Sequence, residues 1–218
     1  MENRNRNFYR EFEEKNYAPR DIIKEMRKVY LPFVKPLQIL YPHGKTYDLG
    51  CGRGEWLELM SSLKFEPFGV DLEEGMLVDC RERGLSVSQG DGILFIKTLP
   101  EESHIVVSAF HVIEHISLDD LKTFIQEALR ILKPGGILLM ETPNPENIRV
   151  ATSNFYLDPT HVRPVPQLLL KFLTEFFGFK RNKLLRLQES VNILNSDNIN
   201  LINVLNDVSP DYAIVAQK

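Results

Sequence analysis

Residues 47–55 read Tyr-Asp-Leu-Gly-Cys-Gly-Arg-Gly-Glu, and this stretch decides the fold. The extended run 46–49 delivers the chain to glycines at positions 50, 52 and 54, and residues 55–60 then have the apolar spacing of a helix. Glycines allow positive φ angles and close approach of a ligand to the backbone, while the first turn of a helix offers unpaired N–H groups. The stretch therefore predicts a strand–loop–helix unit that binds a nucleotide-type cofactor.

The spacing of the glycines separates two kinds of cofactor site. A dinucleotide fingerprint is Gly-x-Gly-x-x-Gly, whereas Gly50, Gly52 and Gly54 form Gly-x-Gly-x-Gly with Asp48 before them. This pattern resembles the first motif of class I S-adenosylmethionine (SAM) methyltransferases. In that family an acidic residue and the loop backbone hold a cofactor with an amino-acid tail. The resemblance implies that the Asp48 carboxylate binds the ammonium group of this tail.

Further acidic residues follow at the ends of two more predicted strands. Asp71 ends the strand 65–70, roughly 20 residues beyond the first acid, where its carboxylate can accept both ribose hydroxyls, as in dinucleotide sites. Asp91 follows the predicted strand 85–88 and resembles the family's acceptor for the adenine amino group. Met76 is a candidate for packing on the adenine ring. The remaining residues that we expect at the cofactor are Leu72, Gly92 and Phe110.

Composition restricts the class of protein. The chain has 218 residues, of which 43% are hydrophobic, enough for a proper core in one domain. A net charge of −4 gives no basic footprint for nucleic acid, and no apolar run is long enough to span a membrane. Two cysteines, Cys51 and Cys80, make no disulfide framework. We therefore expect a soluble cytoplasmic protein without a nucleic-acid partner or a transmembrane segment.

Strands and helices alternate along the chain in the pattern of a doubly wound sheet. The predicted strands are 46–49, 65–70, 85–88, 104–109, 136–142, 179–187 and 211–217, the last two antiparallel; the predicted helices are 55–60, 73–83, 118–132 and 167–177. The order matches the seven-stranded sheet of the methyltransferase family. We expect one α/β domain, 1–218, with a helical amino-terminal cap (1–44) and a Rossmann-like core (45–218). Between residues 189 and 210 only a short helix, 201–205, is predicted.

Three other segments resemble a narrower group. The segment 8–13 (Phe-Tyr-Arg-Glu-Phe-Glu), the loop 143–147 (Pro-Asn-Pro-Glu-Asn) and the segment 154–164 (Asn-Phe-Tyr-Leu-Asp-Pro-Thr-His-Val-Arg-Pro) are similar to methyltransferase domains of bacterial surface-polysaccharide assembly, of the O-antigen type. Those domains are often fused to glycosyltransferases. The resemblance implies a saccharide hydroxyl as the methyl acceptor and glycosyltransferases of the same pathway as partners.

Polar residues gather in two loops that follow predicted strand ends, where ligands of open α/β sheets bind. His111, Glu114 and His115 have the spacing i, i+3, i+4, which on one helical turn directs all three side chains to a common volume. His161 could join them from the second loop. The group resembles the Glu-x-x-Glu-His motif of metal-dependent methyltransferases, with His111 in place of the first Glu, and implies a divalent cation such as Mg²⁺ or Mn²⁺.

A metal-free alternative uses the same residues. His115 or His161 could act as a general base, oriented by Glu114 or Asp158. A third interpretation gives His115 and Glu114 a purely structural role. The sequence thus predicts a SAM-dependent O-methyltransferase of a polysaccharide or its carrier-linked precursor. The alternatives are an O-methyltransferase of a small molecule such as a quinone precursor, and a catalytically silent SAM-binding scaffold for a glycosyltransferase.

Overall fold

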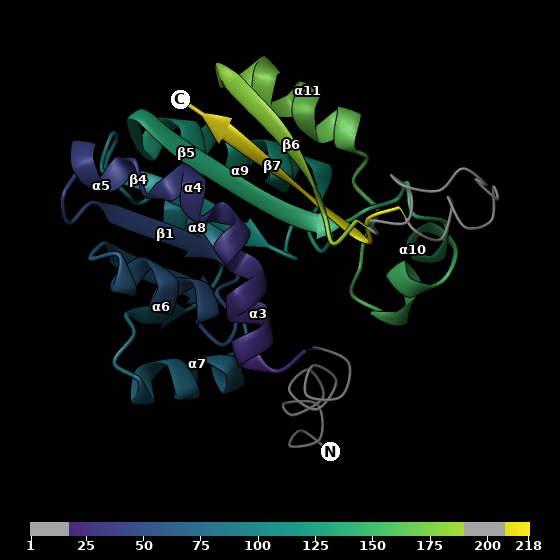
Figure 1. The fold of residues 1–218 in the computed structure, drawn as a ribbon, viewed down its shortest axis with the longest axis horizontal. Helices are drawn as coiled ribbons and strands as arrows, with labels where there is room; N and C mark the ends of the chain where they lie inside the picture. Colours follow the sequence, from purple (N-terminus) through teal and green to yellow (C-terminus); the bar gives the residue numbers. More distant parts are fainter. Residues whose placement is uncertain (1–17, 190–207) are drawn as a thin grey trace.

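The computed structural model describes residues 18–189 and 208–218, which form a seven-stranded sheet covered by helices on both faces (Figure 1). The strand order is β3-β2-β1-β4-β5-β7-β6. β7 runs antiparallel to β5 and β6, and the other neighbouring pairs are parallel. The strands are β1 Lys45–Leu49, β2 Glu66–Asp71, β3 Val87–Gln89, β4 His104–Phe110, β5 Leu132–Pro143, β6 Arg181–Leu187 and β7 Asp211–Gln217.

Alternate residues of the central strands face two separate halves of the core. On β5, Leu138 and Met140 pack with α8, α9 and α11, whereas Ile137 and Leu139 pack with α6 and the amino-terminal helices. The helices are α3 Arg20–Met26, η1 Arg27–Tyr30, α4 Leu31–Val34, α5 Leu37–Leu40, α6 Glu55–Ser62, α7 Glu74–Glu82, α8 Gly92–Ile96, α9 Leu118–Ile131, α10 Ile148–Thr152, η2 Asn154–Leu157 and α11 Gln167–Phe177.

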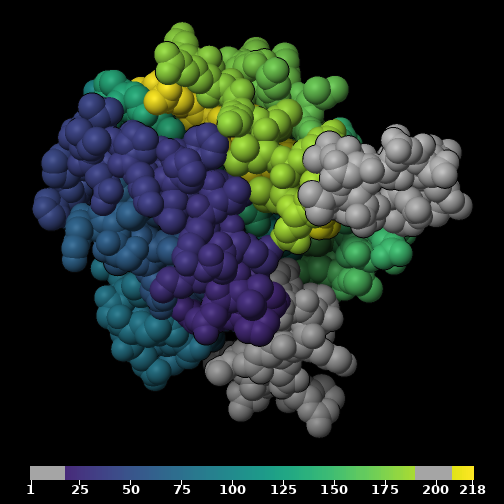
Figure 2. All heavy atoms as spheres, viewed as in Figure 1, coloured from purple at the N-terminus to yellow at the C-terminus, as the bar shows by residue number. Residues whose placement is uncertain are grey.

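The amino-terminal segment 18–40, here called the cap, completes one face of the sheet. Its Tyr30, Val34 and Leu37 are buried in the same cluster as Trp56 and Leu139. In the space-filling view the cap, coloured purple to blue, lies across the middle of this face between α6 and β6 (Figure 2). The cap is therefore part of the hydrophobic core of the described chain.

The predicted α/β architecture is confirmed, and the predicted elements that the structure describes lie within a few residues of the observed ones. The predicted cap, 1–44, is helical in its described part from Arg20 on, and residues 1–17 lie outside the described residues. Three short elements, α8, α10 and η2, were not predicted, since each has four or five residues and too little periodicity to detect. The predicted helix 201–205 lies outside the described residues.

One local prediction is wrong. Residues 111–117 form turns and bends, and the next helix begins only at Leu118, where Ser117 caps it with its side chain. The chain leaves β4 sharply because His111 adopts a left-handed conformation, with φ of 55°. His111, Glu114 and His115 therefore do not share a helical turn.

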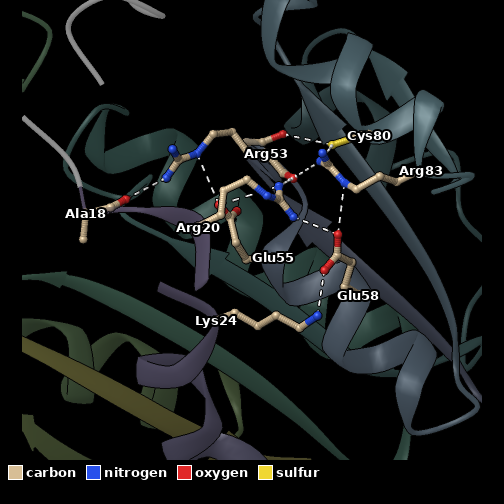
Figure 3. Close-up of polar contacts among 9 residues, drawn as sticks. Ala18, Arg20, Lys24, Arg53, Glu55, Glu58, Cys80 and Arg83 are labelled. Carbon is tan, nitrogen blue, oxygen red and sulfur yellow. Dashed lines mark hydrogen bonds and ion pairs between the residues drawn. The ribbon is translucent and has the colours of Figure 1, made fainter. Parts of the chain in front are cut away.

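A cluster of ion pairs fastens the cap to α6 and the glycine loop (Figure 3). The Glu58 carboxylate of α6 lies 2.7 Å from both Arg20 and Lys24 of α3 and 3.0 Å from Arg83. Arg20 and Arg83 also donate to the backbone carbonyl of Arg53 in the glycine loop. Burial raises the pKa of the Glu58 carboxyl, but the hydrogen bond to Lys24 and the charges of Arg20, Lys24 and Arg83 outweigh this and hold the pKa below its usual value.

We predict that Glu58→Gln loosens the cap. Because the pKa of Glu58 is lowered in the folded protein, its ion pairs stabilise the fold above the pKa of the unfolded chain, and this contribution is lost as the pH falls through the folded pKa. The pairs are partly exposed, so the expected loss is about 1 kcal/mol in the free energy of unfolding. Urea titration at neutral pH measures it, and trypsin cleavage within residues 20–28 should become several-fold faster.

The matched control is Glu82→Gln on α7, an exposed glutamate that takes no part in the ion pairs of Glu58. It should leave both measurements unchanged. Equal cleavage rates in the Glu58 variant and the control would show that the apolar contacts of Tyr30, Val34 and Leu37 alone hold the cap in place.

Candidate functional site

A cavity of ≈ 570 Å³ lies at the carboxyl ends of β1, β2 and β4 and extends to β5. The cap closes one side of it with Ile23, Met26 and Arg27. Most of the residues that the sequence predicted for the cofactor and the acceptor line this one cavity: Asp48, Gly50, Gly52, Asp71, Leu72, Asp91, Gly92, Phe110, His111 and His115. The structure therefore joins the two predicted groups into a single site.

The glycine loop forms the floor of the cavity between β1 and α6. Gly52 has φ of +50°, and no atom lies within 4 Å of the position that a Cβ would occupy. Its backbone is therefore bare toward the cavity, which suits close contact with a ligand. A Cβ on Gly50 would lie 2.3 Å from Val112 Cγ2, so this glycine is required by the loop that follows β4.

Asp48 is the most unusual acid of the site. Its carboxyl group is buried, and the Ser108 hydroxyl donates a hydrogen bond of 2.6 Å to Oδ1. Burial raises the pKa of Asp48 to about 7. A carboxylate that has lost its water in this way is stabilised by a cationic ligand in the same cavity, so Asp48 could hold an ammonium group.

Asp71 and Asp91 line the cavity, and the carboxylate of each also accepts hydrogen bonds from backbone N–H groups. Asp71 accepts hydrogen bonds from the backbone N–H groups of Glu73 (2.9 Å) and Gly52 (2.8 Å), and so ties β2 to the glycine loop. Burial raises the pKa of the Asp71 carboxyl. Asp91 Oδ1 accepts from the N–H groups of Ile93 and Leu94 and caps α8. An Asp before an apolar run is a helix-start signal, and it could have revealed α8 from the sequence.

Two predicted cofactor residues lie outside the cavity lining. Met76 is buried on α7 together with Leu77 and Cys80, because these residues share the helix face that packs on the sheet. Gly54 is the left-handed N-cap of α6, and a Cβ there would lie 2.6 Å from Leu85 Cδ1. Its requirement for glycine is therefore one of packing and not of cofactor contact.

Arg27 and Glu141 are functional candidates that the sequence did not indicate. The Arg27 guanidinium lies 3.7 Å from the centre of the Phe110 ring, and its Nη1 lies 3.4 Å from Glu141 Oε2. The Tyr30 hydroxyl donates to the same carboxylate. Burial raises the pKa of Glu141, but Arg27 and the neighbouring His111 outweigh this and lower it to about 2. No motif links a residue of the cap to one of β5, so only the fold could bring them together.

His111 is a cation within this cluster. Its Nε2 lies 3.2 Å from Glu141 Oε1, and its Nδ1 lies 3.3 Å from Glu114 Oε1. Burial lowers the pKa of the imidazole, but Glu114, Glu141 and the charge of Asp211 outweigh this and hold it well above its usual value. A doubly protonated imidazole has no lone pair for a metal. Among the described residues, His111 does not belong to the group whose possible ligand atoms all lie within 4.8 Å of one another.

The other three predicted ligands do come together. Within the described part of the chain, one possible ligand atom from each of three side chains lies within 4.8 Å of the other two: those of Glu114, His115 and His161. Glu114 is fully buried and accepts a hydrogen bond of 2.9 Å from the Thr142 hydroxyl. The centroids of the His115 and His161 rings lie 4.6 Å apart, and of these two residues only His115 lines the cavity.

His115 differs from His111 in its charge. Burial lowers the pKa of the His115 imidazole, and the nearby Glu114 carboxylate only partly opposes this. At neutral pH the ring is therefore uncharged and can accept a proton or bind a cation. The sequence predicted the same role, that of a metal ligand, for both histidines, but their surroundings shift the pKa of His111 upward and that of His115 downward.

Comparisons with known proteins agree with this geometry. A family model described as a methyltransferase domain matches residues 47–136. A Mycolicibacterium smegmatis protein named "Probable S-adenosylmethionine-dependent methyltransferase" is 35% identical over 136 residues, which cover 61% of this chain and 51% of that protein. A ubiquinone biosynthesis O-methyltransferase of Maricaulis maris is 31% identical over 105 residues, 46% of this chain and 41% of that protein. The chain thus spans about half or less of these two relatives.

A solved structure matches over nearly the whole chain. The SAM-dependent methyltransferase from Archaeoglobus fulgidus has a TM-score of 0.83 and 31% sequence identity, and the match covers 97% of this chain and 100% of that one. The described residues contain no helix that is both long and apolar enough to cross a membrane. The fold match over nearly the whole chain and the methyltransferase-domain match over residues 47–136 show that the chain belongs to the class I SAM-dependent methyltransferases.

Proposed function

We propose that the chain is an O-methyltransferase that transfers the methyl group of SAM to a hydroxyl of a bacterial polysaccharide or its carrier-linked precursor. The observation that carries the proposal is the polar lining of the cavity beside β4 and β5. Glu141, His115, Asp158 and Thr160 bring carboxylate, imidazole and hydroxyl groups to that part of the cavity. Such groups match the many hydroxyls of a sugar better than the flat apolar ring of an aromatic acceptor.

The lining near the glycine loop fits SAM as the cofactor. A bare backbone at Gly52, a dehydrated carboxylate at Asp48 and the acids at the ends of β2 and β3 support this placement. Asp48 would hold the ammonium of the amino-acid tail, Asp71 the ribose hydroxyls and Asp91 the adenine amino group. When bound, SAM supplies an activated methyl group on its sulfonium.

The acceptor side has two tasks, to orient the sugar and to remove the proton of the reacting hydroxyl. The ionised Glu141, fixed by Arg27 and His111, can accept hydrogen bonds from neighbouring sugar hydroxyls. His115 is the base of the proposed mechanism, because it lines the cavity and its lowered pKa leaves it uncharged at neutral pH. The cap and Phe110 exclude water from the same space.

A cation-assisted mechanism is the second candidate, and one observation favours it. The atoms of Glu114, His115 and His161 are close enough to bind one divalent ion, such as Mn²⁺ or Mg²⁺. Such an ion would lower the pKa of a coordinated sugar hydroxyl and replace the base. Two imidazoles favour Mn²⁺ over Mg²⁺ in this set, since Mg²⁺ prefers oxygen ligands.

The relatives favour a second substrate class. Two of them, from Maricaulis maris and a Bradyrhizobium strain, are named ubiquinone biosynthesis O-methyltransferases, so a quinone precursor is the alternative acceptor. A catalytically silent scaffold for a glycosyltransferase is the alternative from another class. An uncharged imidazole at the cavity argues for catalysis over the scaffold.

The acceptor prediction is tested with SAM labelled in its methyl group. We expect transfer to mono- or oligosaccharides and none to catechol-type quinone precursors. His115→Asn should lower kcat about 100-fold or more, because general-base catalysis has that magnitude. The matched control is His43→Asn at an exposed turn with positive φ, which should retain full activity. Transfer to the quinone precursors alone would refute the saccharide acceptor, and no transfer at all would favour the scaffold.

The metal prediction separates the two mechanisms. If His115 acts alone, EDTA leaves turnover unchanged and added Mn²⁺ has no effect. If the cation acts, EDTA abolishes turnover, Mn²⁺ restores it, and His161→Asn lowers the affinity for Mn²⁺. Turnover is followed with the labelled methyl group, and Mn²⁺ binding with electron paramagnetic resonance. The two sets of outcomes exclude one another.

The Asp48 prediction concerns pH. The pKa of Asp48 is raised to about 7 without a ligand, and an ammonium ligand favours the ionised form, so SAM binding should release a proton below pH 7. We expect the affinity for SAM to fall about tenfold per pH unit below pH 7. Calorimetry in two buffers with different ionisation enthalpies counts the released proton.

Asp48→Asn should bind SAM weakly and without this pH dependence. The stability of the unliganded protein changes with pH in the direction opposite to the affinity for SAM. Since the folded state holds the proton of Asp48 more tightly than the unfolded chain, the unliganded protein loses stability as the pH rises from about 4 to about 7. Glu101→Gln, exposed and remote from the cavity, is the control. Unchanged proton release in Asp48→Asn would assign the ammonium to another acid.

A further inference from the structure

The second polar loop makes a short chain of hydrogen bonds that ends on His115. The Thr160 hydroxyl lies 2.7 Å from Asp158 Oδ1 and 2.9 Å from His115 Nδ1. The backbone N–H of Thr160 donates to the same Asp158 oxygen at 2.8 Å. All three residues line the cavity. The chain thus runs from a carboxylate through one hydroxyl to an imidazole.

The direction of these bonds follows from the number of hydrogens. A threonine hydroxyl has one proton to donate, and a carboxylate oxygen accepts. Two oxygens 2.7 Å apart repel each other unless a proton lies between them, so the Thr160 proton points to Asp158. The hydroxyl can then only accept from His115, and His115 Nδ1 must carry a hydrogen.

We propose that Thr160, held by Asp158, is a positioning residue that fixes His115 as the Nδ1–H tautomer and leaves its Nε2 lone pair for the chemistry in the cavity. The assignment of a role to that lone pair rests on the proposed function. In this proposal Thr160 acts on the chemistry through His115.

Backbone hydrogen bonds connect the loop of Thr160 to the segment that carries His115. The backbone N–H groups of Val162 and Arg163 donate to the Glu114 carbonyl at 2.8 and 3.3 Å, so the loop of Thr160 is tied to the residue next to His115. The Asp158 carboxyl is buried. Backbone contacts beside both residues therefore keep the loop of Thr160 next to His115.

His161 has the same tautomer for a different reason. Its Nδ1 lies in hydrogen-bond contact with the backbone carbonyl of Phe155, which can only accept, so this nitrogen also carries a hydrogen. Both neighbouring rings, 4.6 Å apart, then have their lone pair on Nε2. The same preparation serves a base or a metal ligand, since a metal-bound histidine usually donates its other N–H to a protein acceptor.

The test is the tautomer itself, read from two-bond ¹H–¹⁵N correlations of ¹⁵N-histidine-labelled protein at about pH 8, where an imidazole is neutral. The chain has five histidines, and His115→Asn assigns the relevant signals. We expect the Nδ1–H pattern for His115 in the unaltered protein. In Thr160→Val, which keeps the shape and removes the hydroxyl, the population should move toward Nε2–H, and Thr160→Ser should restore the original pattern.

Kinetics supply the second readout. Thr160→Val should lower kcat about 10- to 100-fold, and Thr160→Ser should recover most of the loss. An Nε2–H pattern in the unaltered protein, or a Thr160→Val variant with an unchanged tautomer, overturns the proposal. Because the spectrum needs no acceptor, the expected spectrum without any methyl transfer would refute the proposed function and leave the tautomer assignment standing.

Discussion

The site depends on one constraint, the parallel pairing of β1 with β2 on one side and β4 on the other. Parallel strands end at the same edge of the sheet, so Asp48, Asp71 and Phe110 reach one cavity although they are far apart in the chain. The strand order reverses between β1 and β4, and the connections there diverge and leave a crevice. The cavity occupies this crevice, and the loop after β4 carries the residues of the proposed acceptor side.

Buried charge divides the cavity into two regions. Near the glycine loop, Asp48 has a raised pKa because its burial outweighs the Ser108 hydrogen bond and the charge of Arg27. Near β5, Glu141 has a lowered pKa because Arg27 and His111 compensate for its burial. The Asp48 carboxylate is suited to a cationic ligand, whereas the Glu141 carboxylate is ionised and already paired with Arg27 and His111. The two acids therefore have different chemistry within one site.

The cap links cofactor binding to the stability of the fold. Arg27 and Met26 line the cavity, while Tyr30 belongs to the hydrophobic core and donates to Glu141. The ion pairs of Glu58 attach the preceding helix to α6, directly after the glycine loop. An opening of the cap would therefore expose the cavity and remove one cation from Glu141, whose charge would then be compensated by His111.

The α/β architecture, the strand that leads into the glycine loop and three of the acids at the cavity follow from the sequence, because strand periodicity and glycine spacing are local properties. The sequence also brought His111, Glu114, His115 and His161 into one hypothesis. The opposite pKa shifts of His111 and His115 arise from contacts that exist only in the folded chain. His111 leaves β4 in a left-handed conformation and becomes a cation between Glu114 and Glu141, while Thr160 and Asp158 reach His115 from a loop 45 positions away. Arg27 and Met76 illustrate the same limit, since packing places the first in the cavity and the second in the core, and packing between distant segments leaves no local pattern in the sequence.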